Sequence, residues 1–204
     1  MLMLGRVHVI TDSRPGADPV EQVRALLPAA TPDLVIQFRP ADDWTDRFVY
    51  QAGLEIAELC RTTGVPLLIN DRIDIAMAVD ADGAHVGAED LPVAVARRLL
   101  GPGKILGATA RCGDQAQRAV KDGADYVGAG PCYRTSTKDG LPPPIGPSGI
   151  AQVAPHAPTI AIGGVTLSHV PELKRSGAHG IAVIAAIADA PAPSKALAEL
   201  LAAW

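Results

Sequence analysis

Asp122-Gly-Ala-Asp-Tyr126 is one of three related stretches that decide the fold; the others are Asp82-Gly-Ala-His-Val86 and Ser176-Gly-Ala-His-Gly180. Each places a glycine suited to ending a helix just before a short apolar run suited to a buried strand. The spacings, 40 residues from Asp82 to Asp122 and 54 from Asp122 to Ser176, each fit two strand–helix units of about 20 to 27 residues. This alternation predicts parallel strands joined by right-handed crossovers.

The same alternation continues outward along the chain. Apolar runs predict strands at Val7–Thr11, Leu34–Phe38, Leu67–Asn70, Ala84–Val86, Ile105–Ala108, Asp125–Val127, Thr159–Ile162 and Gly180–Ile184. Helices are expected at Val20–Leu27, Phe48–Thr63, Ile73–Val79, Pro92–Leu99, Asp114–Asp122, Ser148–Val153, Ser168–Ser176 and Ser194–Ala203, with Gly64, Gly83, Gly123 and Gly177 as helix ends. Eight such units predict an α/β fold, a single (β/α)8 TIM barrel over residues 1–204; an open doubly wound sheet is the alternative.

Composition narrows the class of protein. Nearly half of the residues are apolar but only 3% are aromatic, which is typical of parallel strands covered on both faces. The net charge of −4 argues against a nucleic-acid partner or a basic membrane-binding face. Cys60, Cys112 and Cys132 have no metal-ligand spacing and favour a reducing, cytoplasmic setting. No signal-peptide region or membrane-spanning run is evident.

Polar residues gather where the predicted strands end. Since parallel strands end at one rim of a barrel, these side chains are expected to converge there, where barrel enzymes carry their active sites. The residues are Asp12, Gln37, Arg39, Asn70, Asp71, Glu89, Asp90, Thr109, Thr135–Lys138 and Gly163-Gly164.

The segment Gly128–Gly140 carries a candidate phosphate site. Small residues allow close backbone approach, and Thr135, Thr137 and Lys138 add two hydroxyls and an ammonium, the groups that hold a phosphate. It lacks the spacing of a Walker loop, and a solvated surface loop is the alternative. Gly163-Gly164 is suited to the phosphate position that barrels place after strands seven and eight, or to a tight turn.

Asp71 and Asp90 end neighbouring predicted strands, which lie about 4.8 Å apart. Two carboxylates that close are most easily kept ionised by a hard cation such as Mg²⁺. The alternative for each is a cap on the helix that follows. His8 and His85 lie in strand runs and are expected to be satisfied structural groups, and no nucleophile–His–acid set is present.

Several motifs, in order along the chain, resemble the thiamine phosphate synthase family, whose fold is a (β/α)8 barrel. They are Ile10-Thr-Asp12, Gln37-Phe-Arg39, Ile69-Asn-Asp-Arg-Ile-Asp-Ile-Ala76, Asp82-Gly-Ala-His-Val-Gly-Ala-Glu-Asp-Leu-Pro92, Ala124-Asp-Tyr-Val-Gly-Ala-Gly-Pro131, Thr135-Ser-Thr-Lys138 and Ala161-Ile-Gly-Gly-Val165.

The resemblance implies a Mg²⁺-dependent transferase that joins hydroxymethylpyrimidine pyrophosphate to a thiazole phosphate, giving thiamine phosphate and pyrophosphate. By resemblance, Asp71 and Asp90 would be the metal ligands. Contacts to the pyrimidine pyrophosphate would come from Gln37, Arg39, Asn70, Thr109 and Lys138, of which Arg39, Thr109 and Lys138 would be catalytic. The thiazole phosphate pocket would comprise Thr135, Ser136, Thr137, Gly164, Ile184 and Ala185.

The sequence also departs from the family pattern. A lysine usual two residues after Arg39 is replaced by Ala41, with Arg47 as a candidate substitute, and Ala185 stands where Ser is common. The missing lysine favours the thiazole tautomerase paralogue, and a non-catalytic thiazole phosphate binder is a second alternative. The two aspartates, and Pro131 where that paralogue tends to have His, favour the synthase. The expected partners are small molecules, and an oligomer is left open.

Overall fold

The structure, a computed structural model, describes residues 4–135, 137 and 140–204. Within them, parallel strands close into a barrel in chain order, with β1 pairing both β2 and β8. This closure confirms the predicted (β/α)8 barrel and rules out the open sheet. The strands are β1 (Val7–Ile10), β2 (Leu34–Phe38), β3 (Leu67–Asn70), β4 (Gly83–Val86), β5 (Ile105–Ala110), β6 (Tyr126–Ala129), β7 (Thr159–Ile162) and β8 (Gly180–Val183).

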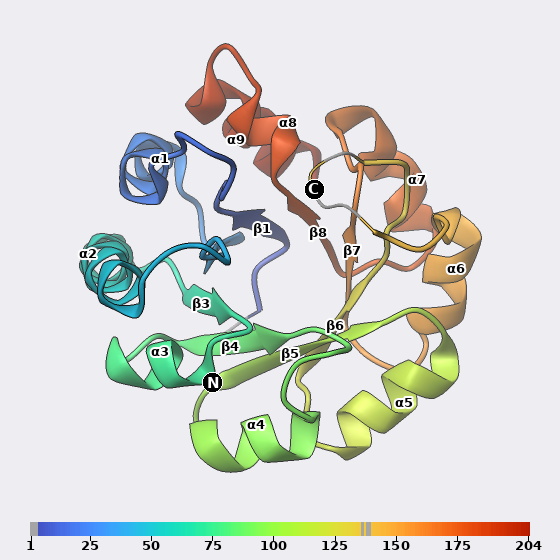
Figure 1. Cartoon of the computed structure of the whole chain (residues 1–204). Helices are drawn as coiled ribbons and strands as arrows, with labels where there is room; N and C mark the ends of the chain where they lie inside the picture. Colours follow the sequence, from blue (N-terminus) through green and yellow to red (C-terminus); the bar gives the residue numbers. More distant parts are fainter. Residues whose placement is uncertain (1–3, 136, 138–139) are drawn as a thin grey trace.

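Helices surround the strands on the outside of the barrel (Figure 1). They are α1 (Pro19–Leu26), α2 (Asp46–Thr63), α3 (Ile73–Ala78), α4 (Val93–Leu100), α5 (Gly113–Lys121), α6 (Gly146–Val153), α7 (Val170–Arg175), α8 (Ala185–Ala188) and α9 (Pro193–Ala203), with short 3-10 turns η1 (Leu27–Ala29) and η2 (Leu167–His169). No helix among the described residues is both long and apolar enough to cross a membrane.

The apolar side chains divide into two layers because successive strand residues face opposite sides of the sheet. Val9, Ile36 and Ile69 belong to the larger layer, which packs between strands and helices. Ile10, Val35, Leu68, Ile105, Tyr126, Ile160 and Ala182 form the smaller cluster that fills the barrel. The uninterrupted burial of β2 follows from these two layers, and it explains why such strands read as continuous apolar runs.

Gly83 corrects one expectation, since it begins β4 and does not end a helix. The chain turns earlier, where α3 is followed by Asp80 with a φ of 52°. A Cβ at Gly83 would lie 1.9 Å from the Ile105 carbonyl oxygen, so close approach of two strands explains this glycine. Gly64, in contrast, closes α2 in the left-handed conformation, as expected.

Three further boundaries differ from expectation near the rim at which the strands end, called the upper rim below. β5 continues through Ala110, so Thr109 lies within the strand, and β6 continues to Ala129. The short helix α8 directly follows β8, where no helix was predicted. Four residues are too few for a helical periodicity to show in the sequence.

Candidate active site

The ends of β2 and β3 contribute a connected row of polar side chains. Gln37, only 4% exposed, donates through Nε2 to Asn70 Oδ1 at 2.6 Å. Asn70 in turn donates through Nδ2 to Asp71 Oδ2 at 2.5 Å. These contacts set the orientation of both amides and leave the Asn70 and Asp71 side chains only partly buried.

Asp71 has an unusual backbone conformation. Its φ is 63°, in the left-handed region, and Arg72 N donates to Asn70 O at 2.7 Å across it, as in a γ-turn. Asp71 N donates to His85 O at 2.7 Å, which ties the turn to β4. A non-glycine residue held in this region stores strain and is a pointer to a functional position. The helix-cap alternative is wrong, because α3 begins after Arg72 without a side-chain cap.

Asp90 lies in the exposed loop between β4 and α4 and faces the same space as Asp71. Its Oδ2 accepts a hydrogen bond from Gly87 N at 2.7 Å. A Cβ built on Gly87 would lie 2.8 Å from Asp90 Oδ2 and 3.9 Å from Asp71 Oδ1, so both carboxylates border a space that a side chain at position 87 would fill. Asp90 does not cap α4, whose first turn has no side-chain cap.

This pair of carboxylates fits Mg²⁺ better than a more thiophilic ion. Magnesium prefers oxygen ligands, binds through one or two carboxylates, and takes its remaining positions from water and substrate phosphates. No group of three or more His, Cys, Asp or Glu side chains that could hold a metal occurs among residues 4–135, 137 and 140–204. A protein cage for a structural metal is therefore not part of the described rim.

Arg39 follows β2, and its backbone is held by Thr11. Arg39 N donates to Thr11 Oγ1 at 2.9 Å. The partly exposed Arg39 guanidinium makes no hydrogen bond or ion pair with another described residue, so this cation is available to an anionic ligand. Arg47, the candidate substitute for the missing lysine, is exposed in the first turn of α2, and Ala41 is half-buried.

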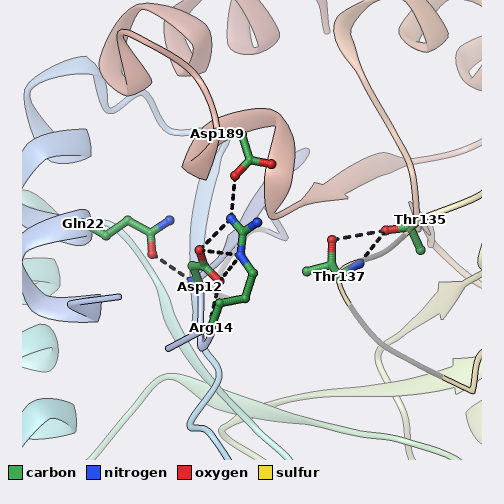
Figure 2. Close-up of polar contacts among 6 residues, drawn as sticks. All are labelled: Asp12, Arg14, Gln22, Thr135, Thr137 and Asp189. Atoms are coloured by element: carbon green, nitrogen blue, oxygen red, sulfur yellow. Dashed lines mark hydrogen bonds and ion pairs between the residues drawn. The ribbon is translucent and has the colours of Figure 1, made fainter. Parts of the chain in front are cut away.

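The loop after β6 carries Thr135 and Thr137, which are hydrogen-bonded to each other. Their hydroxyls share a hydrogen bond at 3.1 Å, and Thr137 N donates to Thr135 Oγ1 at 3.3 Å (Figure 2). Ser136 and Lys138, the other two predicted site residues of this loop, lie outside the described residues.

The β6 loop packs on the glycine pair after β7. Gly164 has a φ of 66°, and a Cβ there would come 2.4 Å from Arg134 O and 2.9 Å from Tyr133 Cβ. Tyr133 N donates to Gly163 O at 2.9 Å, so the two loops run against each other. Any larger residue at 164 would displace the segment that leads into Thr135.

Sequence reasoning missed the residues that anchor this loop. Arg111 donates to Gly130 O at 2.8 Å and to Pro143 O at 2.7 Å, which ties both ends of the loop to the end of β5. The Tyr133 ring stacks on His169 with centroids 3.7 Å apart. A single sequence has no pattern that would pair Arg111 with two carbonyls far along the chain, so only the structure shows these contacts.

The end of β8 brings Ile184 and Ala185 to the same rim, at the start of α8. Beyond α8, Asp189 pairs with Arg14, whose Nη2 lies 2.6 Å from Asp189 Oδ1. Arg14 also donates through Nε to both oxygens of Asp12 at 2.9 Å, and Gln22 Oε1 accepts from Asp12 N (Figure 2). Arg14 thus links the loop after β1 to the turn after α8; of these residues, the sequence pointed only to Asp12.

The Asp12–Arg14 pair shifts both pKa values. Burial raises the pKa of Asp12, but hydrogen bonds from Arg14 and its charge outweigh burial, and the pKa lies below its usual value. The pKa of Arg14 is raised by its hydrogen bonds to Asp12 and Asp189. Both groups are therefore charged at neutral pH and stabilise the seam where β1 meets β8.

Three further side chains meet inside the barrel below the rim. His85 Nε2 lies 3.2 Å from Thr109 Oγ1, and His85 Nδ1 lies 3.1 Å from the Tyr126 hydroxyl. Burial lowers the pKa of His85 to about 4, against a smaller opposing effect of Asp90, so the ring is neutral at pH 7. His85 is thus a satisfied group, as expected. His8 is not, because its buried Nδ1 has no partner.

Cys132 lies within the candidate phosphate-binding segment Gly128–Gly140, but its thiol is unreactive. It is 1% exposed, and burial raises its pKa to about 12. A thiol of this kind is protonated at neutral pH and is a poor nucleophile. Among the described residues, the arrangement offers two carboxylates suited to Mg²⁺, two amides, hydroxyls and a cation.

Comparison with known proteins agrees with this chemistry. Residues 7–187 match the family described as thiamine monophosphate synthase. The chain is 51% identical to a thiamine-phosphate synthase of Salinispora arenicola and 48% identical to one of Salinispora tropica, with 98% of both chains covered in each case. A solved thiamine phosphate pyrophosphorylase from Pyrococcus furiosus superposes with a TM-score of 0.84 at 35% identity, covering 97% of this chain and 94% of that one. The chain belongs to the thiamine monophosphate synthase family.

Proposed function

We propose that this protein is a transferase that joins hydroxymethylpyrimidine pyrophosphate to thiazole phosphate, with release of pyrophosphate and with Mg²⁺ as cofactor. Its family membership and its identity to two thiamine-phosphate synthases support the reaction class. The single structural observation that carries the proposal is that the Asp71 and Asp90 carboxylates border the same space beside Gly87 at the rim where the strands end.

Departure of the leaving group is the step that needs most help from the protein. When the carbon–oxygen bond to pyrophosphate breaks, the electron pair leaves with the pyrophosphate and a pyrimidine-stabilised cation remains. Bound Mg²⁺ would neutralise the charge that builds on the leaving oxygens. Arg39 would add a second positive charge, and Thr109 a hydroxyl donor, at the same place. Lys138 is proposed for the same role from the sequence alone.

Positioning supplies the second step, in which the thiazole nitrogen captures the cation and no covalent nucleophile is required. Thr135 and Thr137, with Ser136 proposed from the sequence, would donate to the thiazole phosphate through hydroxyl and backbone groups. Backbone at Gly164, Ile184 and Ala185 would complete this pocket. Anchoring the phosphate holds the nitrogen in line with the reacting carbon, so the encounter becomes effectively unimolecular. Gln37 and Asn70, already hydrogen-bonded to each other, would hold the pyrimidine pyrophosphate.

The absence of a lysine at Ala41 is the one feature that favours the tautomerase paralogue or a non-catalytic binder. The chain keeps both aspartates and Pro131, and the two Salinispora relatives named above are thiamine-phosphate synthases. These observations support the synthase. We place the protein's substrates among small phosphorylated molecules and its site of action in the cytoplasm, with one domain spanning residues 1–204.

The test is to incubate the purified protein with both substrates, with and without Mg²⁺, and to quantify thiamine phosphate and pyrophosphate. We expect the two products in equal amounts and only with Mg²⁺. Isomerisation of a thiazole phosphate without Mg²⁺, and without pyrophosphate release, would identify a tautomerase. Thiazole phosphate binding with no product in either tube would identify a binder, and either result would overturn the proposal.

A further inference from the structure

Three neighbouring strands place a hydrogen-bonded chain of side chains beneath the rim. Tyr126 on β6 contacts His85 on β4, and His85 contacts Thr109 on β5, at 3.1 Å and 3.2 Å. β5 runs between the other two strands, and Gly107 on β5 is the register partner of both His85 and Tyr126. A Cβ at Gly107 would come 2.4 Å from the Tyr126 hydroxyl and 2.5 Å from His85 Nδ1. The missing side chain at Gly107 is what allows this contact.

The hydrogen bonds that link Tyr126, His85 and Thr109 can run in only two directions, because a neutral imidazole carries one N–H. If His85 Nδ1 held the proton, it would donate to the Tyr126 oxygen. The Tyr126 O–H would then need another acceptor. Tyr126 is 1% exposed, its hydroxyl has no other hydrogen-bond partner among the described residues, and His8 Nδ1 nearby is itself unpartnered. That order leaves a buried donor unsatisfied, which folded proteins avoid.

The other order satisfies every group. Tyr126 O–H donates to His85 Nδ1, and His85 Nε2–H donates to Thr109 Oγ1. The Thr109 oxygen then accepts a hydrogen bond from His85, so its own hydrogen is directed elsewhere. Thr109 is only partly buried at the rim end of β5, so that direction includes the active-site space.

We propose that Tyr126 and His85 are positioning residues that hold Thr109 as an obligate hydrogen-bond donor toward the departing pyrophosphate. The inference rests on the proposed function, since Thr109 is assigned there to the pyrimidine pyrophosphate. A donor directed toward charge that develops on the leaving group stabilises the transition state more than the bound substrate. Loss of Tyr126 lets the His85 ring change its tautomer, and Thr109 can then donate to His85 Nε2.

The kinetic test is a double-mutant cycle with Thr109→Val, Tyr126→Phe and the double variant, each at saturating Mg²⁺. We expect Thr109→Val to lower kcat by roughly 100-fold and Tyr126→Phe by on the order of 10-fold, with little change in KM for the pyrimidine substrate. The double variant should match Thr109→Val alone, because Tyr126 acts only through Thr109. Tyr50→Phe, on the exposed face of α2, is the matched control and should leave kcat unchanged.

A second measurement does not depend on turnover. Protein labelled with ¹⁵N-histidine reports which ring nitrogen carries the proton, and His85→Gln identifies the His85 signals. We expect His85 to be protonated at Nε2 in the unmodified protein, and protonation at Nδ1 would overturn the proposal. This reading also stands if the Tyr126→Phe variant folds poorly.

The results separate two kinds of failure. If the unmodified protein makes no thiamine phosphate, the proposed function falls and this inference falls with it. If the unmodified protein is active but Tyr126→Phe has wild-type kcat, the inference alone is overturned. The same holds if Tyr126→Phe lowers kcat by an equal factor with and without the Thr109 hydroxyl, since that result describes a general structural defect.

Discussion

The two ends of the barrel differ in how their polar groups are used. The lower end, where the strands begin, has a hollow of about 340 Å³ bordered by Cys60, Asp82 and Lys104, and it is larger than the hollow of about 280 Å³ beside Asp12. Its charges are nevertheless paired: Lys104 lies 2.5 Å from Asp80, and Asp82 accepts from Leu67 N at 2.8 Å.

The upper rim, where the strands end, has more polar groups that are available to a ligand. The Arg39 guanidinium makes no hydrogen bond or ion pair with another described residue, Asp71 sits in a strained turn, and two carboxylates border the space beside Gly87. Burial raises the pKa of Cys60 at the lower end to about 12, so that thiol is inert. Available and strained groups, more than the volume of a hollow, therefore indicate the end at which a substrate reacts.

The largest difference in kcat should come from variants of two aspartates that both have a left-handed backbone conformation. Asp71 has a φ of 63° at the rim, and Asp80 has a φ of 52° at the lower end. Asn tolerates this conformation as Asp does, so Asp71→Asn and Asp80→Asn both keep the backbone and remove one charge. We expect Asp71→Asn to lower kcat by more than about 100-fold, since it weakens the metal site, and Asp80→Asn to leave kcat unchanged. Pyrophosphate release measures both, and equal rates would remove the distinction between the ends.

Alanine variants of arginines at the two ends should differ in kcat in the same direction as the aspartate variants, but by a smaller factor. Arg39→Ala removes a cation that would balance charge on the leaving group, and we expect kcat to fall by about 10- to 100-fold. Arg61 borders the lower hollow and pairs with Glu58 at 2.5 Å. Arg61→Ala should have wild-type kcat. Steady-state kinetics at saturating substrates tests the pair, and a larger loss in Arg61→Ala would contradict the assignment.

Alanine substitutions at two glycines with similar backbone angles should separate the energetic cost of lost packing from the cost of backbone strain. Gly164 (φ 66°) has Arg134 O and Tyr133 against it, whereas a Cβ at Gly64 (φ 70°) would meet nothing within 4 Å. We expect Gly164→Ala to lower the free energy of unfolding by about 2–4 kcal/mol and to raise KM for thiazole phosphate. Gly64→Ala should cost about 1–2 kcal/mol and leave KM unchanged. Urea titration and initial rates provide the measurements; similar costs in both variants would mean that loop packing contributes little.

A lysine introduced at position 41 should increase the catalytic efficiency of the site at the upper rim. If this protein neutralises the leaving pyrophosphate with one cation fewer than its family, Ala41→Lys should raise kcat/KM for the pyrimidine substrate by several-fold. Ala41→Gln, of similar length but uncharged, is the control. A rise in both variants would point to packing, and a rise in neither would mean that Arg39 and the metal already suffice.

The smallest effect should come from the Asp12–Arg14 pair at the β1–β8 seam. Because the folded pKa of Asp12 lies below its usual value of 3.8, the pair stabilises the fold fully above the unfolded pKa. This contribution is lost as the pH falls through the folded value. The difference in unfolding free energy between the wild type and Asp12→Asn should be below about 1 kcal/mol at pH 6, since Arg14 is largely exposed. It should shrink toward pH 3, as followed by thermal melts; a constant difference would exclude the ion pair as its source.

The sequence predicted most of the fold because the governing patterns are local. Each strand is a buried apolar run, and helical segments follow these runs, some of them closed by a glycine such as Gly64, so the eight units and their order could be found without coordinates. It also indicated the rim, since polar residues such as Asn70 and Asp90 follow strands. Errors arose where tertiary packing outweighed local preference, as at Gly83, whose role is close approach to β5.

The periodicity of the chain by itself determined a barrel with its chemistry at the strand ends, and the motifs determined the family. Tertiary structure alone decided which side chains act together. Arg14 meets Asp189 across 175 residues, and His85 meets Tyr126 and Thr109 only because Gly107 stands between them. Such contacts depend on closure of the sheet and on side-chain direction in space, for which a single sequence has no local pattern.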